Sequence, residues 1–170
     1  MVIPILFTRI LIDGGVLTAV VSSILVLMLY FKPRMALSDY PQDVRAAVPP
    51  RTKDELRWGI ILSIPMLIIV LAIPLYSTYI LDRQIEGGIT YWMAFVTIFG
   101  ELSVVSLFDL IVLDILMFYT WTPSFFVLPG TEGFPGYKDY RPHVKAQLIK
   151  GNAMLMIFSA SLALIPTFFY

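Results

Sequence analysis

The chain has 170 residues, of which 58% are hydrophobic and 14% charged, and its mean hydropathy is +0.82. Soluble domains average about 45–50% apolar and about 25% charged residues, so this composition argues against a soluble globule. Twelve basic residues balance twelve acidic ones, and there is no cysteine. The charge balance gives no basis for a nucleic-acid partner, and the lack of cysteine excludes disulfides, thiolate metal sites and a cysteine nucleophile.

The chain opens with the apolar stretch MVIPILFTRILIDGG. No basic region precedes this stretch and no small-residue cleavage motif follows it, so we expect it to belong to the mature protein. Arg9 and Asp13 are four residues apart, a spacing that permits an ion pair on one helix face. Gly14 and Gly15 come next, and small residues of this kind permit a close approach of another helix.

Four apolar runs cover residues 10–31, 58–81, 89–117 and 152–170. Each reaches or exceeds about 18–20 residues, the helix length that crosses about 30 Å of hydrocarbon. Core helices of a soluble protein would need polar outer faces, and apart from the third run these segments show almost none. We therefore predict an all-α membrane protein, a bundle of four transmembrane helices that forms a single integral membrane domain over residues 1–170.

The basic residues predict the orientation of this bundle. Ten of the twelve lie in the two long loops, residues 32–57 and 118–151, and only Arg9 and Arg83 lie elsewhere. Cytoplasmic loops carry the excess of Lys and Arg. Both long loops are thus predicted to be cytoplasmic and both termini to lie on the non-cytoplasmic side of a multi-pass membrane protein, in the inner membrane if the source is bacterial.

The first long loop contains signals for two helix starts. Pro41 suits the first turn of a short helix, and Pro49 with Pro50 would end it. Thr52 and Glu55 have the spacing of a capping box immediately before the second apolar run, which predicts that the second span begins near Lys53.

The second long loop mixes aromatic residues with proline and glycine. Its segment PSFFVLPG is apolar but too short to span, so we expect it either to dip into the membrane interface or to pack under the bundle. Residues 142–150 suit a short amphipathic helix on the membrane surface before the last span. Four basic residues of this region are predicted to contact anionic lipid headgroups: Lys138, Arg141, Lys145 and Lys150.

The third apolar run carries three carboxylates at different depths. With the span starting near Ile89, Glu101 lies about 18 Å inside, close to the midplane, and Asp109 about 12 Å further toward the cytoplasm. Asp114 lies about 7 Å beyond that, where it is expected to meet water, headgroups or a basic residue such as Lys32, Arg57 or Lys150. Only Glu101 has no Lys, Arg or His of another span at its depth, so it should be protonated, bound to a cation or open to water.

Two interpretations of Glu101 remain open. Asp109 lies about 80° around the helix from it, with Ser106 near both, and Asp114 lies about 140° beyond Asp109. A stripe of Glu101, Ser106 and Asp109 would suit a path for protons or small cations. The alternative is a structural hydrogen bond from a protonated Glu101 to a Ser, Thr or Tyr of another span, such as Ser22, Ser63 or Ser159.

The remaining motifs limit the chemistry. His143 is the only histidine, so it cannot form a bis-histidine haem site or a His-rich zinc site; it is either a general base beside Asp139 or a solvated surface residue. There is no phosphate-binding loop, HExxH or GxSxG motif. We expect no cofactor and no metal site.

Three functions follow from these features. The first is a non-enzymatic subunit that docks in a homo-oligomer or a larger membrane complex through its intramembrane acid and aromatic loops. The second is a proton- or small-cation-linked transporter or channel that uses the carboxylates of the third helix. The third is a lipid-modifying enzyme at the cytoplasmic interface with His143 and Asp139. The expected partners are the lipid bilayer and either further copies or a larger complex.

Overall fold

The computed structural model describes residues 2–169 and is built from helices, with no β-strand among these residues. The first long helix is α1 (Val2–Phe31) and the second is α3 (Lys53–Gln84). Four helices of 29 to 32 residues are long and apolar enough to cross a membrane. The four predicted spans are therefore confirmed as helices of that kind, compatible with a multi-pass membrane protein, while the sides on which the termini lie stay a prediction.

The third and fourth long helices each change their winding along their length. The third consists of α4 (Tyr91–Phe108) and a π-helix, η2 (Asp109–Trp121). The fourth begins as α5 (Arg141–Ala146), passes through a short π-helix, η5 (Gln147–Gly151), and continues as α6 (Asn152–Leu162). After Ala163 the chain continues as α7 (Leu164–Phe169), and Tyr170, the predicted end of the last span, lies outside the described residues.

Residues 142–150 do not form a separate surface helix. They belong to α5 and η5 and continue directly into α6, so that Arg141–Phe169 is one 29-residue helical segment. The helix continues through Gly151 because this residue has right-handed helical angles (φ −59°, ψ −50°). The prediction of a distinct interfacial helix is wrong.

Side-chain caps mark the starts of the second and third long helices. Thr52 caps α3 through a complete capping box, in which its side chain accepts from the Glu55 amide and the Glu55 side chain accepts from the Thr52 amide. This confirms the predicted start near Lys53. Thr90 caps α4 in a similar way, because its hydroxyl accepts from the amide of Met93.

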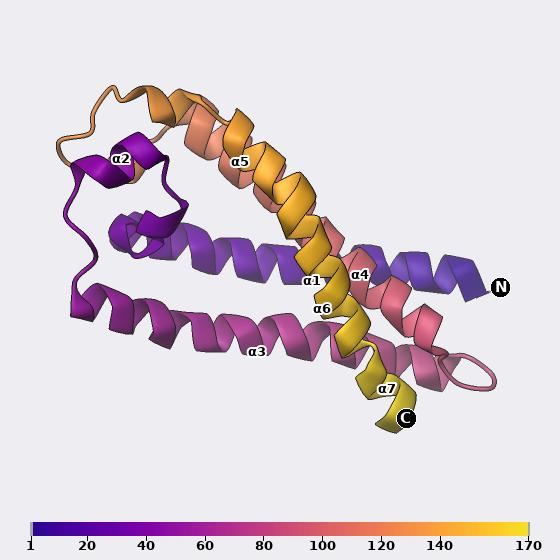
Figure 1. The fold of residues 1–170 in the computed structure, drawn as a ribbon. Helices are drawn as coiled ribbons and strands as arrows, with labels where there is room; N and C mark the ends of the chain where they lie inside the picture. The colour runs from indigo at the N-terminus through magenta and orange to yellow at the C-terminus, as the bar shows by residue number, and fades with distance from the viewer. Residues whose placement is uncertain (1, 170) are drawn as a thin grey trace.

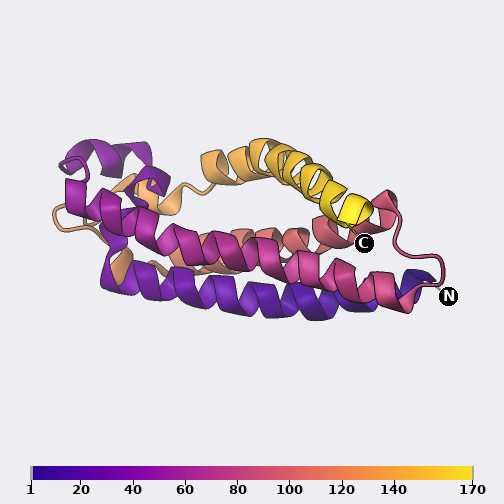
Figure 2. The ribbon, with the colours of Figure 1, turned by 90° about the horizontal axis from the view of Figure 1, so that it is seen from below.

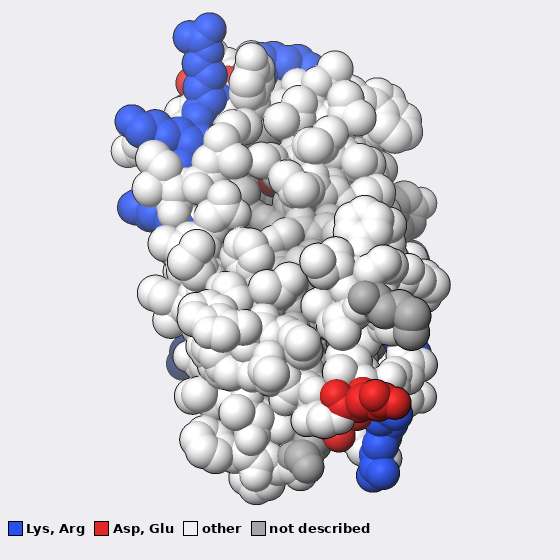
Figure 3. Space-filling view, turned by 90° about the vertical axis from the view of Figure 1, so that its right-hand side faces the viewer, with Lys and Arg blue, Asp and Glu red and all other residues white. Residues whose placement is uncertain are grey.

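The long helices pack as two crossed pairs. In Figure 1, α1 and α3 run alongside each other, and α4 and α6 cross them obliquely. Figure 2 shows the loops that carry α2 gathered at one end of the bundle, while the start of α1 and the C-terminal end of the chain lie at the other. We call the first of these the loop end. On the face shown in Figure 3, charged side chains lie mainly toward the top and the bottom, and most of the area between is uncharged.

A close crossing of α1 and α4 holds the centre of the bundle. A Cβ atom added to Gly14 would lie 3.1 Å from the Cα atom of Glu101 and 3.3 Å from its carbonyl oxygen, whereas one added to Gly15 would meet nothing within 4 Å. On α4, Gly100 leaves room for the side chain of Ile10. The expectation that these glycines permit close helix approach is met by Gly14, and Leu17, Ile98 and Leu102 extend the same core.

The two long loops fold against each other at the loop end. Their short elements are η1 (Pro33–Asp39), α2 (Gln42–Ala47), η3 (Ser124–Phe126) and η4 (Pro135–Lys138). Tyr40 is 4% exposed, and its hydroxyl donates to the carbonyl of Phe126 over 3.0 Å. Burial raises the pKa of Tyr40 well above its ordinary value, with a smaller contribution from Tyr137, so the hydroxyl stays a donor.

The segment PSFFVLPG packs inward. Phe126 and Leu128 are 2% and 1% exposed, and Leu128 joins a cluster with Leu37, Tyr40 and Val44 of the first loop. The amide of Leu128 donates to the hydroxyl of Tyr137. The buried part of this segment packs against the first loop, and its placement relative to the membrane interface stays a prediction.

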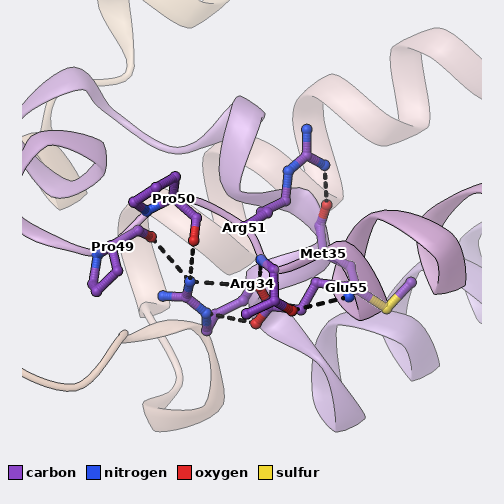
Figure 4. A network of polar contacts seen from close by, with 7 residues as sticks. Arg34, Met35, Pro49, Pro50, Arg51 and Glu55 are labelled. Atoms are coloured by element: carbon purple, nitrogen blue, oxygen red, sulfur yellow. Dashed lines mark hydrogen bonds and ion pairs between the residues drawn. The ribbon is translucent and has the colours of Figure 1, made fainter.

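Arg34 ties the first loop to the start of α3. Its Nε donates to Oε1 of Glu55 over 2.7 Å, and its terminal nitrogen donates to the carbonyls of Pro49 and Pro50 (Figure 4). In the same view Arg51 donates to the carbonyl of Met35 over 2.8 Å. Two arginines of the first loop thus bind partners within the chain.

Candidate functional site

Glu101 lies in the centre of the bundle with no hydrogen-bond partner. Its side chain is fully buried, and neither carboxyl oxygen makes a hydrogen bond to any described residue. Ser77 of α3 lies close enough to interact, but without hydrogen-bond geometry. Arg9 and Asp13 of α1 form an ion pair with each other at 3.3 Å, as their spacing predicts. This pair therefore supplies no free counter-charge.

Two further buried hydroxyls have no hydrogen-bond partner among the described residues, one on α3 and one on α6. They belong to Ser77 and Ser159. The structural hydrogen bond to Ser22, Ser63 or Ser159 is not formed, and Ser63 instead donates to the carbonyl of Ile60. The core thus contains a buried carboxyl group that receives no hydrogen bond from the described residues.

The π-helical winding of η2 brings Asp109 and Asp114 to one cavity. Each amide in such a helix bonds to the carbonyl five residues back, as Thr122 does to Met117 over 2.9 Å. Residues five apart therefore lie on one face of the helix, so the wide separation expected for a regular α-helix does not apply here. Both carboxylates are half-buried and face the loop end.

The fourth helix contributes two polar contacts to this region. His143 Nε2 lies 2.7 Å from Oδ2 of Asp114, and the side-chain amide of Gln147 donates to the hydroxyl of Ser106 over 3.1 Å. Asp139 instead accepts from the amide of Arg141. His143 thus pairs with Asp114 and not with Asp139, which was one of its two predicted settings. For Asp114, expected to meet water, headgroups or a basic residue, the partner in the chain is this histidine.

A cavity of about 300 Å³ opens beside these contacts, and we call it the loop-end pocket. Three carboxylates face it, from Asp39, Asp109 and Asp114, together with His143 and Gln147. Its other walls are apolar or aromatic: Leu25, Val26, Met28, Leu29, Ala36, Tyr40, Leu113, Phe118, Tyr119 and Phe126. Glu101 is not part of the pocket, and Ser106 reaches it only through Gln147.

The pocket is acidic although it lies in the most basic part of the sequence. Among the described residues the ion pairs are Arg9–Asp13, Arg34–Glu55 and His143–Asp114, so Asp39 and Asp109 have none. The loop cations make other contacts. Arg34 and Arg51 bind backbone and Glu55 as described above, and Lys32 lies 4.6 Å from the ring centroid of Trp58.

The four basic residues predicted to bind lipid headgroups are all exposed, but they differ in their contacts within the chain. Lys138 donates to the carbonyls of Tyr119 and Thr120 and to the hydroxyl of Thr122 at the end of η2. Its ammonium group thus caps a helix C-terminus. Arg141, Lys145 and Lys150 are exposed, and headgroup binding by this set stays a prediction.

The pocket does not have the geometry of a metal centre. Among residues 2–169 no three His, Asp or Glu side chains are arranged to hold a metal ion. Comparison of the chain with known families, curated proteins and solved structures finds no match in any of the three.

Proposed function

We propose that this chain is a proton- or small-cation-linked membrane transporter or channel. The observation that supports this most directly is the enclosed carboxyl of Glu101, which has neither a hydrogen bond nor a free counter-charge. The same helix carries Asp109 and Asp114 to an acidic pocket at the loop end. Glu101 would then be the proton-binding group of the core, and the loop-end pocket the site where a cation enters or leaves.

Burying a charged carboxylate in the core of the bundle costs free energy. An isolated carboxylate in an apolar medium is so unfavourable that the group takes up a proton or binds a cation instead. A group that must bind and lose a proton to change its charge is the kind that couples ion movement to a conformational change. Because the chain's own helices cover Glu101, this carboxyl is also poorly placed to dock another protein.

The test is a flux measurement in liposomes. Glu101→Gln keeps the size of the side chain but cannot exchange a proton. The proton or cation flux of the purified variant should therefore be at least tenfold lower than that of the wild type. Glu86→Gln makes the same chemical change at an exposed residue between α3 and α4 and should retain the flux. Equal flux in the wild type and Glu101→Gln would reject this role for Glu101.

A second function, a subunit of a homo-oligomer or larger membrane complex, is supported by α3. All four of its buried residues lie in its C-terminal half: Pro74, Ser77, Thr78 and Leu81. Its N-terminal half exposes a series of large apolar side chains, which either lipid or a second protein would cover. If a protein covers them, the particle mass in mild detergent should be a multiple of the 19.2 kDa chain, and Ile64→Glu should reduce it to one chain. A particle of one chain in the wild type would argue for lipid.

A further inference from the structure

We propose that the loop-end pocket binds an organic ammonium ion with apolar substituents. This names the kind of cation that the proposed transport would carry, and in that respect it rests on the proposed function. The binding step itself depends only on the pocket. Its size, its charge and its aromatic walls each point to this ligand class.

The size of the pocket favours a molecule over a bare ion. A cavity of about 15 Å³ is enough to hold one water molecule, whereas the loop-end pocket measures about 300 Å³. No three carboxylate or imidazole groups among residues 2–169 converge as metal ligands. A desolvated metal ion would therefore lack its oxygen shell here.

The charge of the pocket selects a cation. His143 can neutralise Asp114, with which it pairs at 2.7 Å, but Asp39 and Asp109 are left without an ion pair in the described chain. No Lys or Arg lines the cavity. An anionic group such as a phosphate would meet two unpaired carboxylates, while an ammonium group would be attracted to both.

The walls of the pocket suit the apolar part of such a ligand. The rings of Tyr40 and Phe118 meet edge to face with centroids 5.3 Å apart, and Tyr119 and Phe126 line the same cavity. Aromatic faces attract ammonium ions, which is how quaternary ammonium groups are recognised. On the α1 side the wall is aliphatic, with Leu25 and Leu29, so the ligand would have its charge near the carboxylates and its apolar substituents against α1.

Binding of benzyltrimethylammonium to the full chain in dodecyl maltoside tests the proposal. Its carbon isostere, neopentylbenzene, has the same shape without the charge and should bind at least tenfold more weakly, a difference of about 1.4 kcal/mol. Asp109→Asn should weaken the binding of the ammonium probe about tenfold. Asp39→Asn should weaken it about threefold, and because Asp39 is exposed, this variant is expected to fold normally.

Asp54→Asn is the matched control, since Asp54 is an exposed acid of the first turn of α3 outside the pocket. It should leave binding unchanged. Equal affinity for the charged and neutral probes, or equal losses in Asp39→Asn and Asp54→Asn, would overturn the proposal.

Added phosphatidylethanolamine separates the two sources of an ammonium group. Competition with the probe would assign the site to a lipid headgroup, and unchanged affinity would assign it to a free amine, both within the proposal. Proton flux without ammonium binding would refute the pocket assignment alone. Ammonium binding without any flux in liposomes would refute the transport function alone.

Discussion

Replacing Gly14 by valine is expected to separate α1 from α4 and to lower the free energy of unfolding by about 1–3 kcal/mol, the usual cost of overpacking a close contact. The atoms in the way belong partly to the backbone of Glu101, at 3.1 Å and 3.3 Å from an added Cβ. Backbone atoms cannot rotate aside as a side chain can. The measurement is the unfolding transition of the purified protein in mild detergent.

The neighbouring glycine provides the control for this substitution. Gly15 sits one residue further along α1, and a Cβ added there meets nothing within 4 Å. Gly15→Val makes the same change in helix propensity and apolar area, so it should leave the transition within about 0.5 kcal/mol of the wild type. Similar losses in both variants would show that valine acts through α1 itself and not through the crossing with α4.

Replacing Glu101 by methionine is expected to stabilise the protein while removing the flux. Methionine has a similar length, and it removes two buried oxygens that have no hydrogen-bond partner among the described residues. A buried polar group without a partner costs about 1–3 kcal/mol, so the free energy of unfolding should rise by a part of that amount. Thermal unfolding in detergent measures it.

The opposite result would be equally informative. If Glu101→Met lowers the stability, the carboxyl is stabilised in the native protein by a bound partner, such as a cation, that methionine cannot hold. Glu86→Met serves as the control because Glu86 is exposed, and its effect on unfolding should be close to zero. A functional residue that destabilises its own fold is a frequent compromise in proteins.

Local signals in the sequence predict most of the fold. Four long apolar runs predict the four helices, and the spacing of Thr52 and Glu55 predicts that α3 starts near Lys53, as it does. The winding of η2 is different, because its residues alone do not distinguish bonding to the fourth from bonding to the fifth preceding carbonyl. Tertiary contacts decide that choice, and the relative angle of Asp109 and Asp114 changes with it.

The candidate site was predictable only in part. Depth along one helix singles out Glu101 and Asp109, since it needs only the rise per residue. The contact of His143 with Asp114 spans 29 residues, and it depends on how the second loop folds under the bundle. The sequence does indicate that these two regions are near each other. The third and fourth long helices are consecutive in sequence, so the end of the third and the start of the fourth would lie at the same end of an antiparallel pair.

The two oxygens of Glu55 have a consequence for the loop-end pocket. Oε1 accepts from Arg34 of η1, while Oε2 accepts from the Thr52 amide that begins α3. Movement of the first loop along α3 would therefore break the ion pair between Arg34 and Glu55. Because η1 ends at Asp39 and Tyr40 follows it, this ion pair, together with the hydrogen bond from Tyr40 to Phe126, holds two residues of the pocket wall in place.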